Sequence, residues 1–575
     1  MTDIKRTLLT GGLIAGVLLF MPFYFNIIGY EPGSAAHDET VVQKKAVSDI
    51  VFSSPPSTNN GTSKALSPSE TAAADEELFS IKNNKFSALL SNWSGGSLVQ
   101  YELNKDIKQY VGGYNDLGQY EETLPVSLLL NSDKRCAPCV TTSLTSEEEE
   151  QILSVPLPLV SSSVPLIRGA DGVQQIFLRE GMSATLVFRQ EGLIEKTVTI
   201  EYDNFVIKHH LRVLPGASFK VGLMWDKGLR NTEQNLVDEI SYSLASVGVD
   251  KNIEDISLSP GSINDKIDKK TFAGADWAAI RNKYFIMAMV PESPVEASYS
   301  ASSYFLNDKA LVPSYATNIR AAALSQDLSC RVFLGPLDLE HVNSLDAYLD
   351  RIMNFGWFVL QPFSRSILWL LKFFHGVGLN YGVILVLFAF IVRFITGPLT
   401  KKSHESSQKM QELQPKIQSL QEKYKNNPQK LNQETIKLYK ESGTNPLGGC
   451  LPMLLQMPLL FSLFIVFRTT IEFRGAPFFG WISNLSQPDT IISLPINIPL
   501  YGDQIAFLPI LLGITMFLSQ RISMASMDPK QKPFMYIMSV FFYLIFNSFP
   551  SGLNLYYVVY NILNYFQQKS LKRPT

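Results

Sequence analysis

The chain has 575 residues, which is enough for several domains, and its net charge of −2 gives no indication of nucleic-acid binding. Hydrophobic residues make up 46% of the sequence, which is high for a soluble protein. The excess lies in one N-terminal segment and in the C-terminal part of the chain, which predicts a protein that is partly embedded in a membrane.

The N-terminal apolar segment, residues 7–28, is 22 residues long and follows Lys5 and Arg6. A membrane-spanning helix needs about 20 such residues, whereas the apolar region of a signal peptide has about 7–15. We therefore expect residues 1–30 to form an uncleaved anchor with a cytoplasmic N-terminus, since positive charge precedes the span. Cleavage near residues 33–36 is the alternative. Residues 31–76, rich in Ser, Thr, Ala, Pro and Asn, are expected to form a flexible linker.

Residues 77–345 have the composition of a soluble domain with short strand signals. Strands are indicated at residues 86–90 and 97–101, around Gly95-Gly96, and at 183–188, 197–200 and 205–207. Such a series of short strands predicts a large antiparallel β-sandwich. The sequence shows no Ser/His/Asp spacing, phosphate loop or metal-ligand cluster, so we expect neither catalysis nor a cofactor.

Two pairs of residues in this domain could in principle bind a metal ion or carry out redox chemistry, but their sequence contexts favour structural roles. His209 and His210 are neighbours on an expected strand, where successive side chains point to opposite faces, so binding of one metal ion by both is not expected. Cys136 and Cys139 have the CxxC spacing, which alone is a weak redox signal. The pair indicates a small loop disulfide or two unpaired thiols.

Residues 346–378 are aromatic and amphipathic, as expected of a helix that lies in the membrane interface. A packed helix of the soluble domain is the alternative. Five apolar spans are then expected at residues 379–399, 449–470, 505–523, 533–549 and 550–567, and the anchor makes six.

The charges beside the spans predict their orientation. The loop between the first two, residues 400–448, carries nine Lys against five Glu, and the tail, residues 568–575, is also basic. The loop at residues 471–504 has one Arg and three acidic residues, and residues 524–532 form another short loop with Lys530 and Lys532 at its end. We therefore expect both termini in the cytoplasm and the β-rich domain outside.

The basic loop has an apolar pattern of its own. Residues with spacings of 3, 4, 3 and 4 form one seam of a helix, followed by a break at Asn426-Asn427-Pro428 and a shorter second seam. An antiparallel helical hairpin is therefore expected in the cytoplasm. The residues of the first seam are Met410, Leu413, Ile417, Leu420 and Tyr424.

One charge lies deep in a span. Arg393 precedes Lys401 by eight residues, about 12 Å at 1.5 Å per residue. A charge at such depth is costly, and none of the five C-terminal spans contains a carboxylate that could pair with it. Two interpretations stay open: the side chain reaches back to the cytoplasmic surface, or it faces a hydrated cavity. Uncharged polar residues in the other spans could hold helices together or line such a cavity.

Several ordered motifs resemble the YidC family of membrane-protein insertases. They include residues 390–393 and 397–400, residues 413–417, residues 445–452 with 456–458, and residues 549–553 with 555–557. Residues 277–279, 283–285 and 335–336 resemble the large periplasmic domain of Gram-negative members.

The resemblance implies a polytopic α-helical protein of the bacterial inner membrane, with six transmembrane helices, a five-helix core and a periplasmic sandwich. It implies a hydrophilic groove that receives the acidic tail of an incoming membrane protein and releases the apolar helix into lipid. The implied partners are nascent membrane proteins, Sec translocon components, the ribosome and membrane lipids, with no sequence-specific nucleic acid and no cofactor. The expected groove residues are Arg393, Gln456, Gln520, Asn547, Asn554, Tyr556 and Tyr557.

Two features depart from the family pattern. Ala389 stands where well-known members have Thr, one turn before the arginine, and the basic tail is short. Two rival functions also fit a polytopic chain. A solute transporter or channel usually shows repeated spans with broken helices, and none is evident in the sequence. An envelope scaffold would give Arg393 a purely structural role.

Overall fold

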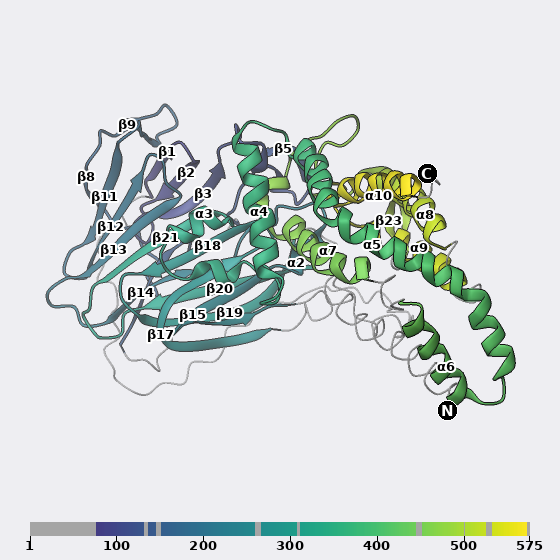
Figure 1. The fold of residues 1–575 in the computed structure, drawn as a ribbon. Helices are drawn as coiled ribbons and strands as arrows, with labels where there is room; N and C mark the ends of the chain where they lie inside the picture. Colours follow the sequence, from purple (N-terminus) through teal and green to yellow (C-terminus); the bar gives the residue numbers. More distant parts are fainter. Residues whose placement is uncertain are drawn as a thin grey trace, which may run out of the picture.

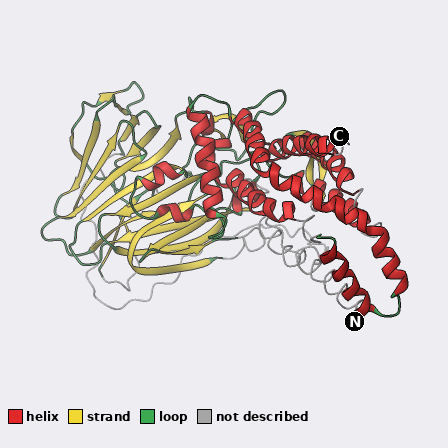
Figure 2. Ribbon diagram, viewed as in Figure 1, coloured by secondary structure: helices red, strands yellow, loops and turns green. Residues whose placement is uncertain are grey.

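The computed structural model describes residues 76–130, 136–144, 151–258, 266–306, 311–443, 451–498, 501–524 and 532–571. The expected anchor lies outside these residues, as do nearly all of the expected linker and half of the basic tail. Strands gather in one part of the molecule and helices in another, so the change of composition near residue 345 corresponds to a change of architecture (Figures 1 and 2).

The β-rich domain contains a large sheet of fourteen strands. Its main path runs β7-β6-β14-β20-β19-β17-β18-β21-β13-β12-β11-β8, and β15 and β16 branch from β17. The bounds are β6 Cys139–Ser143, β7 Gln151–Ile152, β8 Leu159–Ser162, β11 Ser183–Gln190, β12 Ile194–Glu201, β13 Val206–Val213, β14 Lys220–Trp225, β15 Leu244–Val249, β16 Asn252–Ile256, β17 Ile267–Arg281, β18 Phe285–Pro291, β19 Val295–Phe305, β20 Leu311–Arg320 and β21 Leu328–Pro336.

A second sheet of five strands, in the order β3-β2-β1-β10-β9, packs against part of the first. The rings of Phe79 and Phe188 meet edge to face across the two sheets at 5.8 Å, and the Tyr101 hydroxyl donates to the Leu334 carbonyl at 2.6 Å. Its strands are β1 Leu78–Lys82, β2 Phe86–Ser91, β3 Ser97–Leu103, β9 Ile167–Arg168 and β10 Gln174–Phe177; a separate hairpin is formed by β4 Val111–Tyr114 and β5 Tyr120–Pro125.

The sequence-based strands are all present, but the wholly antiparallel expectation is wrong at one pair. Strand β1 lies parallel to β10, with Phe79 opposite Gln174. About ninety residues separate these strands along the chain, and such a long connection permits parallel pairing that a tight hairpin forbids.

His209 and His210 lie on opposite faces of β13, as predicted. His209 is buried, and its ring nitrogens have no hydrogen-bond partner among the described residues, whereas Nδ1 of His210 lies 2.9 Å from the Ser329 hydroxyl. The two rings therefore do not converge on one site.

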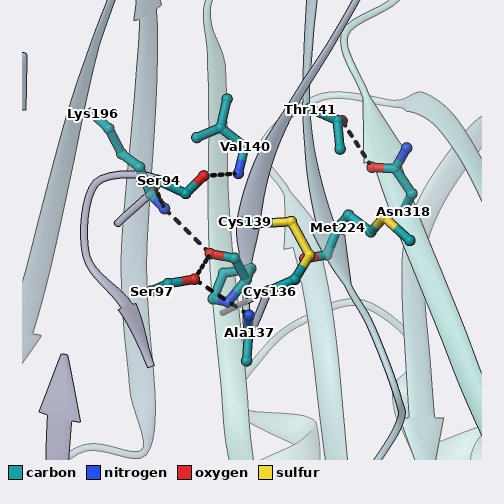
Figure 3. The surroundings of a disulfide bond; sticks show 11 residues. Ser94, Ser97, Cys136, Ala137, Cys139, Val140, Thr141, Lys196, Met224 and Asn318 are labelled. Carbon is teal, nitrogen blue, oxygen red and sulfur yellow. Dashed lines mark hydrogen bonds between the residues drawn. A yellow bond between two sulfur atoms is a disulfide. The ribbon is translucent and has the colours of Figure 1, made fainter. Parts of the chain in front are cut away.

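Cys136 and Cys139 form a disulfide, one of the two arrangements that the spacing allowed (Figure 3). Both residues are buried, and the loop is held by Ser97, whose hydroxyl donates to the Pro138 carbonyl at 2.9 Å. Disulfides persist in oxidising compartments, so this bond is consistent with a periplasmic location for the β-rich domain.

Lys196 occupies a core position beside that loop. The alternation of β12 buries every second side chain, and position 196 is one of them. Its amine donates to the carbonyls of Ser94 and Pro138 at 3.1 and 3.4 Å (Figure 3). Burial lowers the pKa of Lys196 to about 7.

This buried amine predicts a pH dependence of stability. Between pH 7 and 10.5 the unfolded chain binds a proton at Lys196 that the folded chain does not, so the free energy of unfolding should rise with pH in this range. At 1.36 kcal/mol per pKa unit, the upper limit of the effect is roughly 5 kcal/mol. Thermal unfolding of Lys196→Met should show a weaker rise than the unsubstituted protein. Lys208→Met, which removes an exposed lysine of β13, is the control, and equal slopes for all three proteins would contradict the prediction.

The C-terminal part is helical. Its elements are α4 Gln361–Gly376, α5 Tyr381–Lys423, α6 Pro428–Glu441, α7 Leu451–Thr469, α8 Phe507–Met524, α9 Lys532–Phe546 and α10 Ser551–Leu571, with a hairpin of β22 Thr490–Ile498 and β23 Gly502–Ala506 between α7 and α8. Short helices in the connecting segments are η1 Lys108–Tyr110, α2 Leu236–Ile240, α3 Leu339–Asn343, η2 Leu349–Ile352 and η3 Ile471–Phe473.

The expected span at residues 379–399 and the start of the expected cytoplasmic loop belong to one helix; within it, Tyr381–Lys402 is the segment apolar enough to cross a membrane. Helix α5 continues without interruption for 43 residues, from the apolar segment into the charged one. Leaving the membrane changes the environment of the side chains but does not require the backbone to stop being helical. The expected loop thus begins as an extension of the span.

The helices of the C-terminal part differ in the length of their apolar segments. Among the described residues, one helical segment, Tyr381–Lys402, is long and apolar enough to cross a membrane by itself. Gln456–Thr469 and Phe507–Arg521 are shorter apolar segments. The six-span arrangement therefore stays a prediction.

Helix α4 is amphipathic, as predicted. Ile367, Leu368 and Leu371 are buried, whereas Trp369 and Phe373 are exposed on the other side. The buried face packs on α7 and α5, so the helix belongs to the helical part.

Candidate functional site

Arg393 is a residue of α5, and its side chain lies against α10. Its side chain is 7% exposed, and its guanidinium carbon lies 5.6 Å from the centre of the Tyr560 ring, within the range of a cation–π contact. The Nη1 atom lies 3.5 Å from the Thr400 hydroxyl, two turns further along α5. The charge is therefore enclosed by helices and directed toward the end of the span that was predicted to be cytoplasmic.

The guanidinium is incompletely satisfied. Its Nε and Nη2 atoms are buried and have no hydrogen-bond partner among the described residues. The described spans contain no Asp or Glu that could supply one. A buried cation with unused donors is unfavourable by itself, and an incoming carboxylate would satisfy two donors at once in a bidentate arrangement.

Other polar side chains lie between Arg393 and the end of the helices that was predicted to be cytoplasmic. Gln567 of α10 donates to the Gly397 carbonyl at 3.4 Å. One turn earlier, Asn564 donates to the Ser519 hydroxyl of α8 at 2.7 Å and accepts from Gln568 at 3.3 Å. The faces of α5, α8 and α10 that meet here are therefore polar rather than uniformly apolar.

The two expected tyrosines adjoin this region. Tyr556 and Tyr557 are buried, and their hydroxyls have no hydrogen-bond partner within the described part of the chain. The Tyr556 ring packs between Phe388 and Tyr560, at centroid distances of 5.6 and 6.0 Å. Gln456, on α7, is half-buried. These residues stay candidates for substrate contact.

The remaining expected amides are occupied by other contacts. Asn547 is fully buried and donates to the carbonyls of Tyr501 and Gln504 at 2.8 and 2.6 Å. Asn554 donates to the Phe546 carbonyl at 3.1 Å and so braces the turn between α9 and α10. Gln520 accepts from the Ser539 hydroxyl of α9. These contacts hold helices and a hairpin together, so we leave the three residues out of the proposed substrate surface.

The helical hairpin has the predicted form. Asn427 caps α6 by accepting from the Lys430 amide at 3.1 Å, and Pro428 begins the helix. Helix α6 packs back on the end of α5. Of the residues predicted to form the first seam, Leu413 is buried, and Ile417, Leu420 and Tyr424 are partly buried. The side chain of Met410 lies outside the described residues.

Two arginines of the helical part enter the β-rich domain, which the sequence did not predict. Arg468, in the last turn of α7, pairs with Asp238 of α2. Asp238 also accepts from Lys283 at 2.7 Å. Burial raises the pKa of Asp238, but the two cations lower it more, so the net pKa lies below the usual range.

Arg474 makes the more extensive connection. It is 2% exposed, and its Nε donates to Glu233 at 2.6 Å. The other donors reach carbonyl groups on two segments of the domain, at Gln109 (2.5 Å), Val111 (3.0 Å), Gly112 (2.8 Å) and Thr232 (3.0 Å).

A second carboxylate lies beside the Arg474–Glu233 pair. Burial, with a further contribution from Glu233, raises the pKa of Glu239 to about 7. Together these groups form a buried polar junction that fixes the β-rich domain on the helices.

Sequence reasoning missed Thr400, Tyr560 and Gln567 as neighbours of Arg393. The spacing 393, 397 and 400 on one helix face was available as a signal, as was the spacing 560, 564 and 567 on another. For Arg468 and Arg474 no such signal exists, because their partners lie more than 200 residues away in the sequence.

Comparisons with known proteins agree with the motifs. Residues 372–575 match the family model described as 60Kd inner membrane protein, and residues 121–370 match the model described as YidC periplasmic domain.

The chain is 34% identical over 537 residues to a membrane protein insertase YidC from Prosthecochloris aestuarii, covering 90% of this chain and 85% of the relative. It is 40% identical over 365 residues to a protein of the same name from Chlorobium phaeovibrioides, but that match spans 61% of each chain. A solved structure titled as an active YidC insertase with its first transmembrane domain resolved is 16% identical, covering 87% of this chain and 95% of that one, with a TM-score of 0.35.

Proposed function

Because this chain belongs to the YidC family of membrane-protein insertases, we propose that it inserts membrane proteins and assists their folding in the bacterial inner membrane. The observation that carries the proposal in this chain is the enclosed guanidinium of Arg393, with two unused donors in a region without carboxylates. The proposed mechanism of insertion involves no catalytic residue.

The chemistry of Arg393 suits a transient acidic ligand. A planar guanidinium presents paired N–H donors that match a carboxylate, and its charge persists at any physiological pH. In the proposed mechanism, helices α5 and α10 separate on the cytoplasmic side, and the acidic tail of a substrate replaces the ring of Tyr560 as the partner of the cation. The groove so formed would include Arg393, Gln456, Tyr556 and Tyr557.

The driving force would come from the substrate. Over part of the membrane's thickness, the polar residues of the tail would contact hydrated groups of the protein rather than lipid. This lowers the free-energy cost of moving the tail across the hydrocarbon. Burial of the following apolar segment in lipid would then make the overall step favourable. This sequence of events requires no nucleotide.

The proposal includes a topology. We place both termini in the cytoplasm and the β-rich domain in the periplasm, with six spans counting the N-terminal anchor. The lysine-rich loop and the disulfide support this orientation. The hairpin of α5 and α6 would recruit the ribosome or the nascent chain, and the periplasmic domain would offer a surface to the Sec translocon.

Insertion into vesicles tests the proposal. Vesicles that contain only this protein, without nucleotide, should take up a small single-span substrate with an acidic tail, and the tail should become protected from external protease. Protein-free vesicles are the control. Failure of protection would contradict an autonomous insertase, whereas uptake of a small solute without protection of the tail would favour the transporter alternative.

A further inference from the structure

The β22–β23 hairpin carries an unusual amount of exposed apolar surface. Ile491, Ile492 and Ile496 are 50%, 54% and 64% exposed. Within residues 490–507 the only acidic or basic residue is Asp503. The two strands form a sheet of their own, and a two-stranded hairpin is marginally stable in water without further support.

Part of that support comes from the membrane helices. The Tyr501 hydroxyl lies 3.1 Å from that of Tyr543, near the end of α9. Asn547, which follows α9 directly, accepts from the Ala506 amide at 3.1 Å and donates to the carbonyls of Tyr501 and Gln504. The hairpin is therefore fixed at the end of α9 that the proposed topology places at the periplasmic surface.

The other side of the hairpin is continuous with α8. Strand β23 ends at Ala506, and α8 begins at Phe507. Trp481 is half-exposed, packs edge to face on Phe507 at 4.9 Å and donates to Asp489 at 2.9 Å. Asp489 also accepts from the Leu508 amide at 2.8 Å. An exposed indole held at the start of a spanning helix is typical of the membrane–water interface.

From this geometry we infer that the β22–β23 hairpin lies in the outer leaflet of the membrane and binds lipid through its isoleucines. The hairpin is joined to the ends of α8 and α9, Asp503 is the only acidic or basic residue in its sequence, and the exposed Trp481 lies beside the start of α8. The inference rests on the topology given under the proposed function and goes beyond insertase activity, which the experiment below measures separately.

A lipid-quenching experiment on the full chain tests this inference. Cys450 is first replaced by serine, since Cys136 and Cys139 are paired and Cys330 is buried. An environment-sensitive fluorophore is then attached at Ile496→Cys, and the protein is reconstituted in phosphatidylethanolamine–phosphatidylglycerol vesicles. A nitroxide placed near the lipid headgroup should quench this label at least threefold more than a label at Val160→Cys. Val160 is an exposed position of β8 in the β-rich domain.

The quenching results distinguish lipid from protein as the binding partner of the β22–β23 hairpin. Equal quenching at both positions, with equal access of aqueous iodide, would overturn the inference. Protection of position 496 from iodide only after addition of a substrate protein, without lipid quenching, would also overturn it and would indicate a protein-docking surface. A vesicle insertion assay on the same labelled protein reports the proposed function separately.

Discussion

Replacing Arg393 by alanine is expected to lower the initial rate of insertion of a small, acidic-tailed substrate about tenfold. A charge-assisted hydrogen-bonded contact contributes roughly 1.5–3 kcal/mol, and its loss would remove the interaction that draws the tail between α5 and α10. The rate would be measured as protease-protected substrate in vesicles with matched amounts of protein. A substrate whose tail acids are replaced by asparagine should lose this sensitivity.

Arg393→Lys is the matched control. Lysine keeps the charge but loses the paired donors, so its rate should stay within about threefold of the unsubstituted protein. Structural damage would affect both variants, because each removes the guanidinium that lies on Tyr560 and near Thr400. Unimpaired insertion by the alanine variant would refute a role for the charge with that substrate.

The second large effect is expected at the domain junction. Arg474→Ala leaves Glu233 without its cation beside Glu239, and it leaves four backbone carbonyls without the donor that Arg474 supplied. Breaking a buried ion pair by removing one partner typically costs about 3–5 kcal/mol. The apparent melting temperature should therefore fall by roughly 10 °C, and the connection to the helices should become sensitive to protease.

Two further variants give this prediction its controls. Arg212→Ala removes an exposed arginine of β13 and should change the melting temperature little. The double variant Arg474→Leu with Glu233→Leu removes both charges and should recover part of the loss, since no unpaired carboxylate remains at position 233. A melting temperature for Arg474→Ala equal to that of Arg212→Ala would show that the junction contributes little to stability.

Patterns of side-chain alternation were sufficient to predict much of the fold. The apolar alternation of β12, the glycine turn between β2 and β3, and the seams of the helical hairpin each depend on residues close together in the sequence. The helix α5 was predicted in two pieces because apolar and charged segments were read as separate elements, although both favour the same backbone conformation.

The polar residues of the core were harder to predict. A strand pattern shows that position 196 faces inward, but it does not show that Lys196 meets the carbonyls of a disulfide loop. Asn547 has the composition of a groove residue, and only the position of the β22–β23 hairpin reveals its structural contacts. Arg393 could be identified from the sequence because it is a charged residue within an otherwise apolar span. Arg474 was not, because its partners come from distant segments.

The proposed mechanism requires that the acidic tail of a substrate contacts Arg393 between α5 and α10. Site-specific photocrosslinking of a stalled nascent chain tests it most directly, with a photoreactive phenylalanine analogue at Gln456 or Tyr560 and, as the lipid-facing control, at the exposed Phe566 of α10. We predict adducts at 456 and 560 that exceed those at 566 and that weaken at 560 when the tail acids become asparagine. Adducts of equal yield at all three positions, or none at 456 and 560, would contradict the claim.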